Sequence, residues 1–383
     1  RPILILSSLL KGLFRRGAEP GNGLQHADRP MLTSLRLSHF RCFESLRLPL
    51  EPGMTLFFGD NAQGKTSILE AACVLLRLQS PRTSSLSELV HFGAPGFAVA
   101  GDLGDTELRH HYGPRIRKLL VDGEAQASSG PYLRQSGLVV WMASDDLALV
   151  RSSAEGRRRY LDFMAAQLHP GYGTALRAYD RALRSRNVLL KRDAVPRWNE
   201  IDAYTRLLAE HGKMLTTLRR SLVERLRPHT AEAQRHISGR EDEGLDLAYE
   251  AASGPGDDLA ATLLARREEE VRRRQTVAGP HRDDLILLVQ ERPAAKFASE
   301  GQQRTVALAL KLAQSRLFLT EKERAPVLLI DDVFGELDPG RRNALMAAWP
   351  KESQKLITTT HLGWLDAACG SPRRLVVSGG RVA

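Results

Sequence analysis

The segment GDNAQGKT, residues 59–66, constrains the fold of this chain more than any other feature. It satisfies the pattern G-x-x-x-x-G-K-[S/T] and lies between a short apolar run, Thr55–Phe58, and a stretch with helical periodicity from about Lys65 to Leu78. Glycines let successive backbone N–H groups point at one anion, and the start of a helix adds partial positive charge. The segment therefore predicts a phosphate-binding loop in an α/β domain, with a nucleoside triphosphate and Mg²⁺ as cofactors. The residues expected to bind the phosphates are Gly59, Asp60, Asn61, Ala62, Gln63, Gly64, Lys65 and Thr66.

A second segment supplies the carboxylates that such a loop needs. Val327–Ile330 is an apolar run expected to be a buried strand, and Asp331 and Asp332 follow it directly. Thr66 and Asp331 are the expected Mg²⁺ ligands, because hydroxyl and carboxylate oxygens suit this ion. Asp332 is expected to polarise the attacking water, and Lys65 to reach the β- and γ-phosphates as a further catalytic residue.

The pattern along the chain indicates one α/β domain made from both chain ends. Strand patterns surround the phosphate-binding loop and return from Leu285 onward, whereas residues 151–240 have helical periodicity and contain 19 Lys/Arg against 9 Asp/Glu. We therefore predict a domain of residues 31–148 and 276–383 with an inserted, mainly helical lobe of residues 149–275. Residues 1–30 are expected to be a disordered or vector-derived leader.

Composition excludes several classes of protein. Hydrophobic residues make up 42% and charged residues 26%, which excludes a disordered or collagen-like chain. The cysteines, Cys42, Cys73 and Cys369, are far apart and form no disulfide framework, which favours a reducing, cytoplasmic location. No apolar run approaches the roughly 18 residues of a membrane span, which excludes an integral membrane protein. The net charge of +10 favours a polyanionic partner, either nucleic acid or an anionic membrane surface.

Three more segments distinguish among the families that share this loop. Residues 299–303, SEGQQ, resemble the signature motif of ABC ATPases, and residues 336–338, ELD, resemble their D-loop. His361 follows an expected strand, Lys355–Thr359, where those ATPases have a switch histidine. Together these segments indicate an ABC-type ATPase head, with three catalytic residues, Lys65, Asp332 and His361, and further nucleotide contacts from Ser299, Gly301, Gln302 and Asp338.

In detail the chain resembles the RecF family from about Leu32 to the C-terminus. The resemblance rests on HFR at 39–41, GDNAQGKT at 59–66, RRRYLD at 157–162, GPHRDD at 279–284, SEGQQRT at 299–305 and DDVFGELD at 331–338. His39 departs from the family, which often has an asparagine there. ABC ATPases place a glutamine at the end of a strand that precedes the helical lobe. Here the expected strand is Leu138–Met142, and residues 143–146 after it contain no glutamine. Gln135 comes before this strand and is therefore not assigned to that role. SMC-type proteins have long heptad helices that this chain lacks, and ABC transporter ATPases lack GPHRDD.

The resemblance implies an ATP-driven dimer. Lys65, Thr66 and Asp331 of one head would hold ATP and Mg²⁺, while Ser299 and Gly301 of the other head would contact the γ-phosphate. Hydrolysis would then release the dimer. Asp332 is one methylene shorter than the glutamate of most ABC ATPases, so we expect slow, DNA-stimulated hydrolysis.

The resemblance also implies the partners. These are duplex, gapped or junction DNA, bound without sequence preference, and recombination-mediator proteins that help load a recombinase onto single strands in repair, replication and the SOS response. We expect Arg157–Arg159 either to contact this DNA or to pair internally with Glu155 and Asp162. For His281 and Arg282 two roles are open: they sense the nucleotide or DNA, or they are structural turn residues. Two other functions stay open, an ATP-gated scaffold for another protein and a soluble transporter ATPase subunit. Salt dependence separates DNA binding from the scaffold function, because a phosphate-driven complex weakens steeply with ionic strength.

Overall fold

The apolar runs predicted to be strands beside the phosphate-binding loop lie side by side in one sheet. This computed structural model describes residues 31–193, 195–253, 258–365 and 371–383. The sheet has the order β15-β14-β3-β13-β12-β8, and its neighbours are parallel except β14 and β15. Because parallel strands end at one edge of a sheet, the loops after β3, β13, β12 and β8 meet there. The strands are β3 (Met54–Phe58), β8 (Val139–Ala143), β12 (Val327–Asp331), β13 (Lys355–Thr359), β14 (Arg373–Ser378) and β15 (Arg381–Val382).

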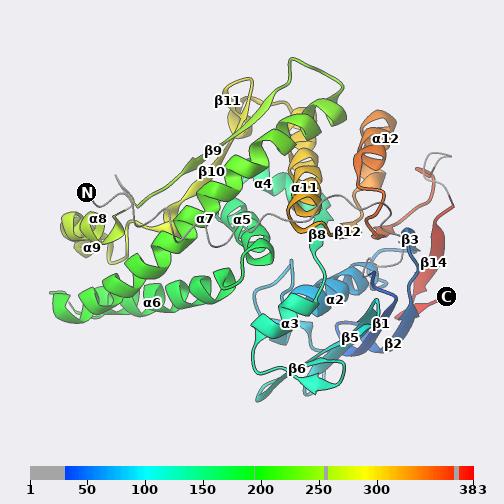
Figure 1. Ribbon diagram of the computed structural model, residues 1–383, viewed down its shortest axis with the longest axis horizontal. Coiled ribbons are helices and arrows are strands. Elements are labelled where there is room, and N and C mark those ends of the chain that lie inside the picture. The colour runs from blue at the N-terminus through cyan, green and yellow to red at the C-terminus, as the bar shows by residue number, and fades with distance from the viewer. Residues whose placement is uncertain (1–30, 194, 254–257, 366–370) are drawn as a thin grey trace, which may run out of the picture.

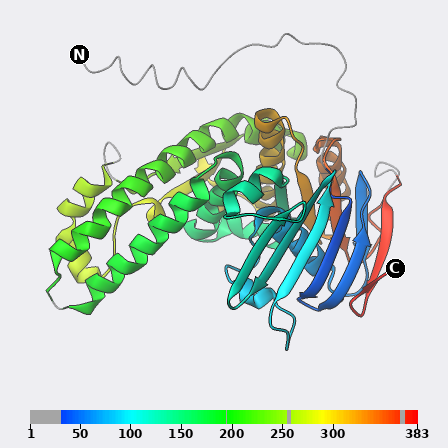
Figure 2. The ribbon, with the colours of Figure 1, turned by 60° about the horizontal axis from the view of Figure 1, so that its bottom comes forward.

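A second, antiparallel sheet covers helix α2 (Lys65–Arg77) from the other side. Its order is β2-β1-β4-β5-β6-β7, and α2 contacts β1, β4 and β5 of this sheet as well as β8, β12 and β13 of the parallel sheet. Figure 2 shows this sheet at the right of the molecule. An Asp-Gly turn, Asp122–Gly123, joins β6 to β7 with positive φ at both residues, as a tight hairpin requires. The strands are β1 (Ser34–Phe40), β2 (Phe43–Pro49), β4 (Phe97–Leu103), β5 (Thr106–Gly113), β6 (Ile116–Val121) and β7 (Glu124–Ala125).

A helical arm projects from this head (Figure 1). Helices α6 and α7 form its length and pack along each other, and α7 also packs against α11, whose first turn contains the predicted signature motif. The apolar residues of these helices belong to one core with the outer face of the parallel sheet. The helices are α3 (Ser129–Gln135), α4 (Ala148–Arg151), α5 (Ala154–Leu168), α6 (Tyr172–Arg192), α7 (Trp198–Ser238), α8 (Leu259–Ala265), α9 (Arg267–Arg273), α10 (Ala294–Phe297), α11 (Glu300–Lys322) and α12 (Pro339–Ala348), with short 3₁₀ turns at Leu86–Leu89, Ser144–Leu147, Pro280–Arg282 and Phe334–Glu336.

A small third sheet crosses the predicted limit between residues 275 and 276. Strand β9 (Leu245–Glu250) comes from the predicted helical lobe and pairs antiparallel with β10 (Asp284–Val289), which pairs with β11 (Arg292–Pro293). Strand β9 was not among the predicted elements. The arm is therefore joined to the returning chain by backbone hydrogen bonds as well as by packing.

The remaining sequence predictions compare directly with the structure. The predicted strands and helices around the phosphate-binding loop are confirmed to within a few residues at each end. The predicted leader and Cys369 lie outside the described residues, and the two described cysteines, Cys42 and Cys73, are free thiols. No helix in the described part of the chain is long and apolar enough to cross a membrane.

Candidate functional site

The phosphate-binding loop follows β3 and has a backbone that only glycine fits at two positions. Gly59 has φ of 150°, and a Cβ there would overlap the carbonyl oxygen of Val377 in β14. Gly64 has φ of 102°, and its Cβ would lie 2.6 Å from the Sγ of Cys42. Glycine avoids both the strain and the overlap, so the loop can curl tightly in front of α2. Gln63 fixes the loop further, because its Oε1 accepts a hydrogen bond from the Gly379 N–H at 2.7 Å.

Backbone donors in this loop are free to bind an anion. Within the described part of the chain, the N–H groups of residues 61–64 donate no hydrogen bond to the protein. No acidic residue lies in the first turn of α2, where it would repel a phosphate. The Lys65 Nζ donates to the carbonyl oxygens of Gly59, at 2.6 Å, and Asp60, at 2.7 Å. Burial lowers the pKa of Lys65, and the nearby Asp332, Asp331 and Asp60 oppose this shift.

Thr66 and Asp331 meet although 265 residues separate them. The Thr66 hydroxyl donates to the Asp331 Oδ1 at 2.7 Å, and the Thr358 hydroxyl of β13 donates to the same atom at 2.7 Å. Burial raises the pKa of the Asp331 carboxyl, while these two hydrogen bonds and the charge of Arg82 lower it. Thr358 was not among the predicted site residues. The parallel register of β12 and β13, which pairs Asp331 with Thr358, is the signal that would have identified it.

Asp332 turns away from the strand at the end of β12. It has a left-handed backbone with φ of 51°, and its N–H donates to the Thr358 hydroxyl at 3.0 Å. Its carboxylate is close enough to Lys65 to raise the pKa of that ammonium. The predicted switch histidine, His361, is exposed two residues after β13, and its Nε2 would lie 3.3 Å from a Cβ built at Gly335. The chain thus brings Lys65, Thr66, Asp331 and Asp332 together at one edge of the sheet.

The end of β8, where ABC ATPases place a glutamine, has a different arrangement here. Ala143 pairs with Asp331 in the parallel register, so β8 ends level with the site. Asp146 then turns back, and its Oδ2 accepts the N–H of Ala143 at 2.8 Å. Its Oδ1 lies 2.6 Å from the Nζ of Lys311 in the middle of α11. Gln135 ends α3, before this strand, and no hydrogen bond joins its side chain to the site among the described residues.

The predicted signature residues form the start of α11 and bond to one another. Ser299 is the N-cap: its hydroxyl accepts the Gln302 N–H at 3.3 Å, and the Gln302 Oε1 accepts the Ser299 N–H at 2.8 Å. The Gln302 amide also donates to Glu243 at 3.3 Å. Among the described residues, no hydrogen bond or ion pair joins Ser299, Gly301 or Gln302 to the phosphate-binding loop.

Asp338 lies with this second group of residues. It caps α12, where its Oδ1 accepts the Arg341 N–H at 3.0 Å and its Oδ2 accepts from the Arg341 guanidinium at 2.9 Å. That guanidinium covers Gly301, since a Cβ there would lie 2.9 Å from its Nη2. The predicted site residues therefore fall into two half-sites: the loop half-site (Lys65, Thr66, Asp331, Asp332) and the signature half-site (Ser299, Gly301, Gln302, Asp338).

The two other specific motifs bond to each other at the base of the arm. Arg157 forms a bidentate pair with Asp284 at 2.8 Å, and Arg158 donates to the carbonyl oxygen of Asp283 at 2.8 Å. Of the predicted internal pairs, Arg159 with Glu155 is confirmed, whereas Asp162 instead pairs with Arg219 at 2.7 Å.

His281 also has structural partners. Its Nδ1 lies 2.7 Å from the Tyr179 hydroxyl and its Nε2 lies 3.2 Å from the Thr276 carbonyl oxygen. Burial lowers the pKa of His281 to about 4, so the ring is neutral at pH 7. Of the two alternatives for His281, these contacts fit the structural one. His39 has φ of 52°, which is a left-handed backbone conformation. Asparagine and histidine are both enriched in this conformation, so histidine can replace the asparagine of the family at this position.

The loop half-site fits a polyphosphate and Mg²⁺. The free N–H groups and the uncapped start of α2 suit phosphate oxygens, and glycine at 59 and 64 permits the tight loop that points these N–H groups at one anion. The Thr66 hydroxyl and the Asp331 carboxylate, 2.7 Å apart, are the oxygen donors that Mg²⁺ prefers.

Comparison with known proteins agrees with this geometry. A family model described as an AAA domain matches residues 34–113. The DNA replication and repair protein RecF of Symbiobacterium thermophilum is 40% identical over 347 residues, which cover 86% of this chain and 92% of that protein. A solved structure of the recombination mediator protein RecF-ATP in the RecFOR pathway superposes with a TM-score of 0.83 and 27% identity, and it covers 94% of this chain and 99% of its own. The Smc head bound to the C-winged helix domain of ScpA, at 17% identity and a TM-score of 0.52, shares the fold. The chain belongs to the RecF family of DNA replication and repair proteins, and its fold is that of an ABC-type ATPase head.

Proposed function

We propose that this chain binds ATP and Mg²⁺, dimerises around them and in that state binds DNA in recombinational repair. The separation of the two half-sites supports this proposal most. The loop half-site holds donors for a triphosphate, whereas the signature half-site has no bond to it within the described residues. A second copy of the chain would bring its signature half-site to the γ-phosphate, so ATP would link the two copies.

Each residue of the loop half-site has a distinct task. Lys65 would exchange its bonds to Gly59 and Asp60 for bonds to the β- and γ-phosphates. Thr66 and Asp331 would hold Mg²⁺, and Thr358 would keep the Asp331 carboxylate oriented toward it. The ion, when bound, neutralises charge on the phosphates.

Hydrolysis is proposed to be slow and DNA-stimulated. Asp332 would orient the attacking water, and His361 would contact the γ-phosphate from the neighbouring strand end. Asp332 is short, and its left-handed backbone fixes the direction of a side chain that has little reach. Slow hydrolysis suits a switch that sets the time of DNA release, rather than a motor that needs rapid turnover.

The wider role follows from the same proposal. The ATPase domain comprises residues 31–148 and 276–383, with residues 149–275 as the inserted lobe. The partners would be duplex, gapped or junction DNA and other recombination mediators, with which the protein would help load a recombinase in the cytoplasm. The protein named RecF-ATP in the RecFOR pathway, similar over 94% of this chain, supports these assignments.

The experiment is binding of duplex DNA with ATP, with ADP and without nucleotide, together with sedimentation of the protein. ATP should produce both dimers and DNA binding, and Lys65→Met should lose both. Lys351→Met serves as a matched control, because Lys351 is exposed and lies outside both half-sites. Dimers that form with ATP but do not bind DNA at low salt would refute the DNA role and favour a protein scaffold.

A further inference from the structure

Helix α6 presents a basic face to solvent. Seven of its residues are exposed, and five of these are cations. The spacing of Arg177, Arg181, Arg184 and Lys191 puts them on one side of the helix, which we call the α6 stripe. The sole acidic residue of α6 is Asp180, which is half-buried.

The cations of the α6 stripe have no carboxylate partner. Within the described part of the chain none of the four forms an ion pair, although Arg177 donates to the Thr174 hydroxyl at 3.2 Å and Arg184 lowers the pKa of nearby Asp180. The fifth exposed cation, Arg192, is different because it pairs with Asp193 and Glu200. The α6 stripe therefore gathers four cations, none of them in an ion pair among the described residues, on one exposed helix face, where an anionic ligand can meet them.

The α6 stripe continues onto the head. Arg117 of β6 is partly covered and partly exposed: desolvation of the covered part lowers its pKa most, and the charge of nearby Arg177 lowers it further. In Figure 1 β6 and α6 lie on the same lower side of the molecule. The like charges of Arg117 and Arg177 repel each other, and an anion bound between them would offset this repulsion.

We propose that the α6 stripe and Arg117 form a surface that binds the phosphate backbone of duplex DNA. This inference rests on the proposed DNA binding and assigns it to a surface. From Arg177 to Lys191 the helix rises about 21 Å, and a duplex presents one phosphate charge per about 1.7 Å of its axis. Four cations at this spacing can therefore each meet a phosphate, without reading bases.

The rest of α6 favours DNA over a membrane. An interfacial helix needs a free apolar face, but the apolar residues of α6, such as Tyr179 and Leu190, are buried, many of them against α7. Val188 is the one large apolar side chain exposed on this helix, at 62%. One such residue gives little area to insert among lipids.

The test is a salt titration of duplex binding by the full chain with ATP. The stripe variant is Arg177→Gln, Arg181→Gln, Arg184→Gln, Lys191→Gln. The control variant is Arg47→Gln, Arg324→Gln, Lys351→Gln, Arg374→Gln, which removes the same charge from exposed positions outside α6 and β6. Four lost phosphate contacts per protomer should make the slope of log K against log salt shallower by about 3.6 for each protomer of the dimer whose stripe contacts the duplex. For one such protomer, the wild type should lose about 150-fold more affinity than the stripe variant between 50 and 200 mM salt.

The outcomes separate this inference from the proposed function. A shallower slope in the stripe variant alone, with ATP binding and circular dichroism unchanged, supports the surface. If the wild type binds duplex with ATP but both variants keep its slope, or both lose it equally, the surface is wrong and the proposed function stands. A wild type that binds ATP but no duplex refutes both. If the stripe variant loses binding to phosphatidylglycerol vesicles and keeps its DNA slope, the surface is a membrane site.

Discussion

The Asp146–Lys311 pair connects the end of β8 to the helix that begins with the signature motif. The Lys311 Nζ lies 2.6 Å from the Asp146 Oδ1 and donates to the Trp141 carbonyl oxygen at 2.8 Å. The two side chains are 7% and 14% exposed, and the Tyr160 ring lies 5.5 Å from the same ammonium. Lys311→Met keeps most of the side-chain volume and leaves the Asp146 carboxylate without its partner.

Breaking a buried pair in this way costs about 3–5 kcal/mol, and the cost should depend on pH. Burial already raises the pKa of Asp146, against the lowering effect of Lys311, and the variant should raise it further. The folded state then holds a proton that the unfolded state has released. The free energy of unfolding of Lys311→Met should therefore rise as the pH falls from 8 toward 5, whereas the wild type changes less over this range.

Urea unfolding at pH 8 and pH 5.5 measures both effects. Asp146→Asn with Lys311→Met is the matched control, because the amide can still accept the Ala143 N–H without a buried charge. It should recover most of the loss at pH 8. A cost below about 1 kcal/mol at pH 8, or the same cost at both pH values, would show that the pair does not hold the signature helix.

Three more predictions concern the site, the arm and the acid stability of the head. Gly64→Ala should abolish binding of a fluorescent ATP analogue, since the alanine Cβ would meet the Cys42 Sγ at 2.6 Å; Gly156→Ala, with no atom within 4 Å of its Cβ, should not. Glu270→Gln should cost about 3–5 kcal/mol in urea unfolding by leaving Arg186 buried with a weaker partner, and the double change to methionine should restore part of it. Burial lowers the pKa of His110 to about 3, so the unfolded state takes up a proton before the folded state does as the pH falls. The free energy of unfolding should therefore be highest above about pH 6.5 and should fall by on the order of 4 kcal/mol as the pH approaches 3. His110→Leu should remove most of this fall in urea unfolding, and an equal fall in both proteins would contradict the prediction.

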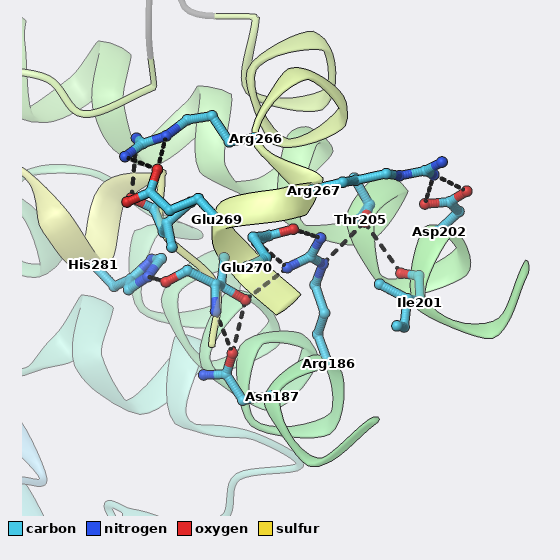
Figure 3. Close-up of polar contacts among 12 residues, drawn as sticks. Arg186, Asn187, Ile201, Asp202, Thr205, Arg266, Arg267, Glu269, Glu270 and His281 are labelled. Atoms are coloured by element: carbon cyan, nitrogen blue, oxygen red, sulfur yellow. Dashed lines mark hydrogen bonds and ion pairs between the residues drawn. The ribbon is translucent and has the colours of Figure 1, made fainter. Parts of the chain in front are cut away.

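The buried pair in the arm shows how its helices are held in register. Arg186 of α6 donates to both carboxylate oxygens of Glu270 in α9, at 2.6 and 2.7 Å, and to the hydroxyls of Thr205 and Thr276 (Figure 3). The Asn187 Oδ1 accepts both the N–H and the hydroxyl of Thr276, each at 2.8 Å. Each of the three guanidinium nitrogens of Arg186 has at least one partner, so this network holds α6 against α7 and α9 and keeps its outer face in one direction.

The sequence predicted the loop half-site better than its surroundings. A local pattern defines Lys65 and Thr66, and Asp331 follows from the end of an apolar strand. Thr358 depends on which residue of β13 lies beside Asp331, and that register comes from packing across the sheet. Strand β9 was missed for a related reason: it is defined by its pairing with β10, which is far along the chain.

The family motifs and the unpaired charges lie in different places, and this difference guides where a ligand should be sought. RRRYLD and GPHRDD are among the most specific segments of the sequence, yet Arg157 and Arg158 bond to Asp284 and Asp283 and so hold the base of the arm. Arg157 would give up its bidentate pair with the Asp284 carboxylate, and Arg158 its bond to the Asp283 carbonyl oxygen, on meeting a phosphate, so each gains little from the exchange. The cations of the α6 stripe belong to no motif and have no such bond to lose. Specific motifs thus indicate the family, while the unpaired cations indicate the surface that DNA would bind.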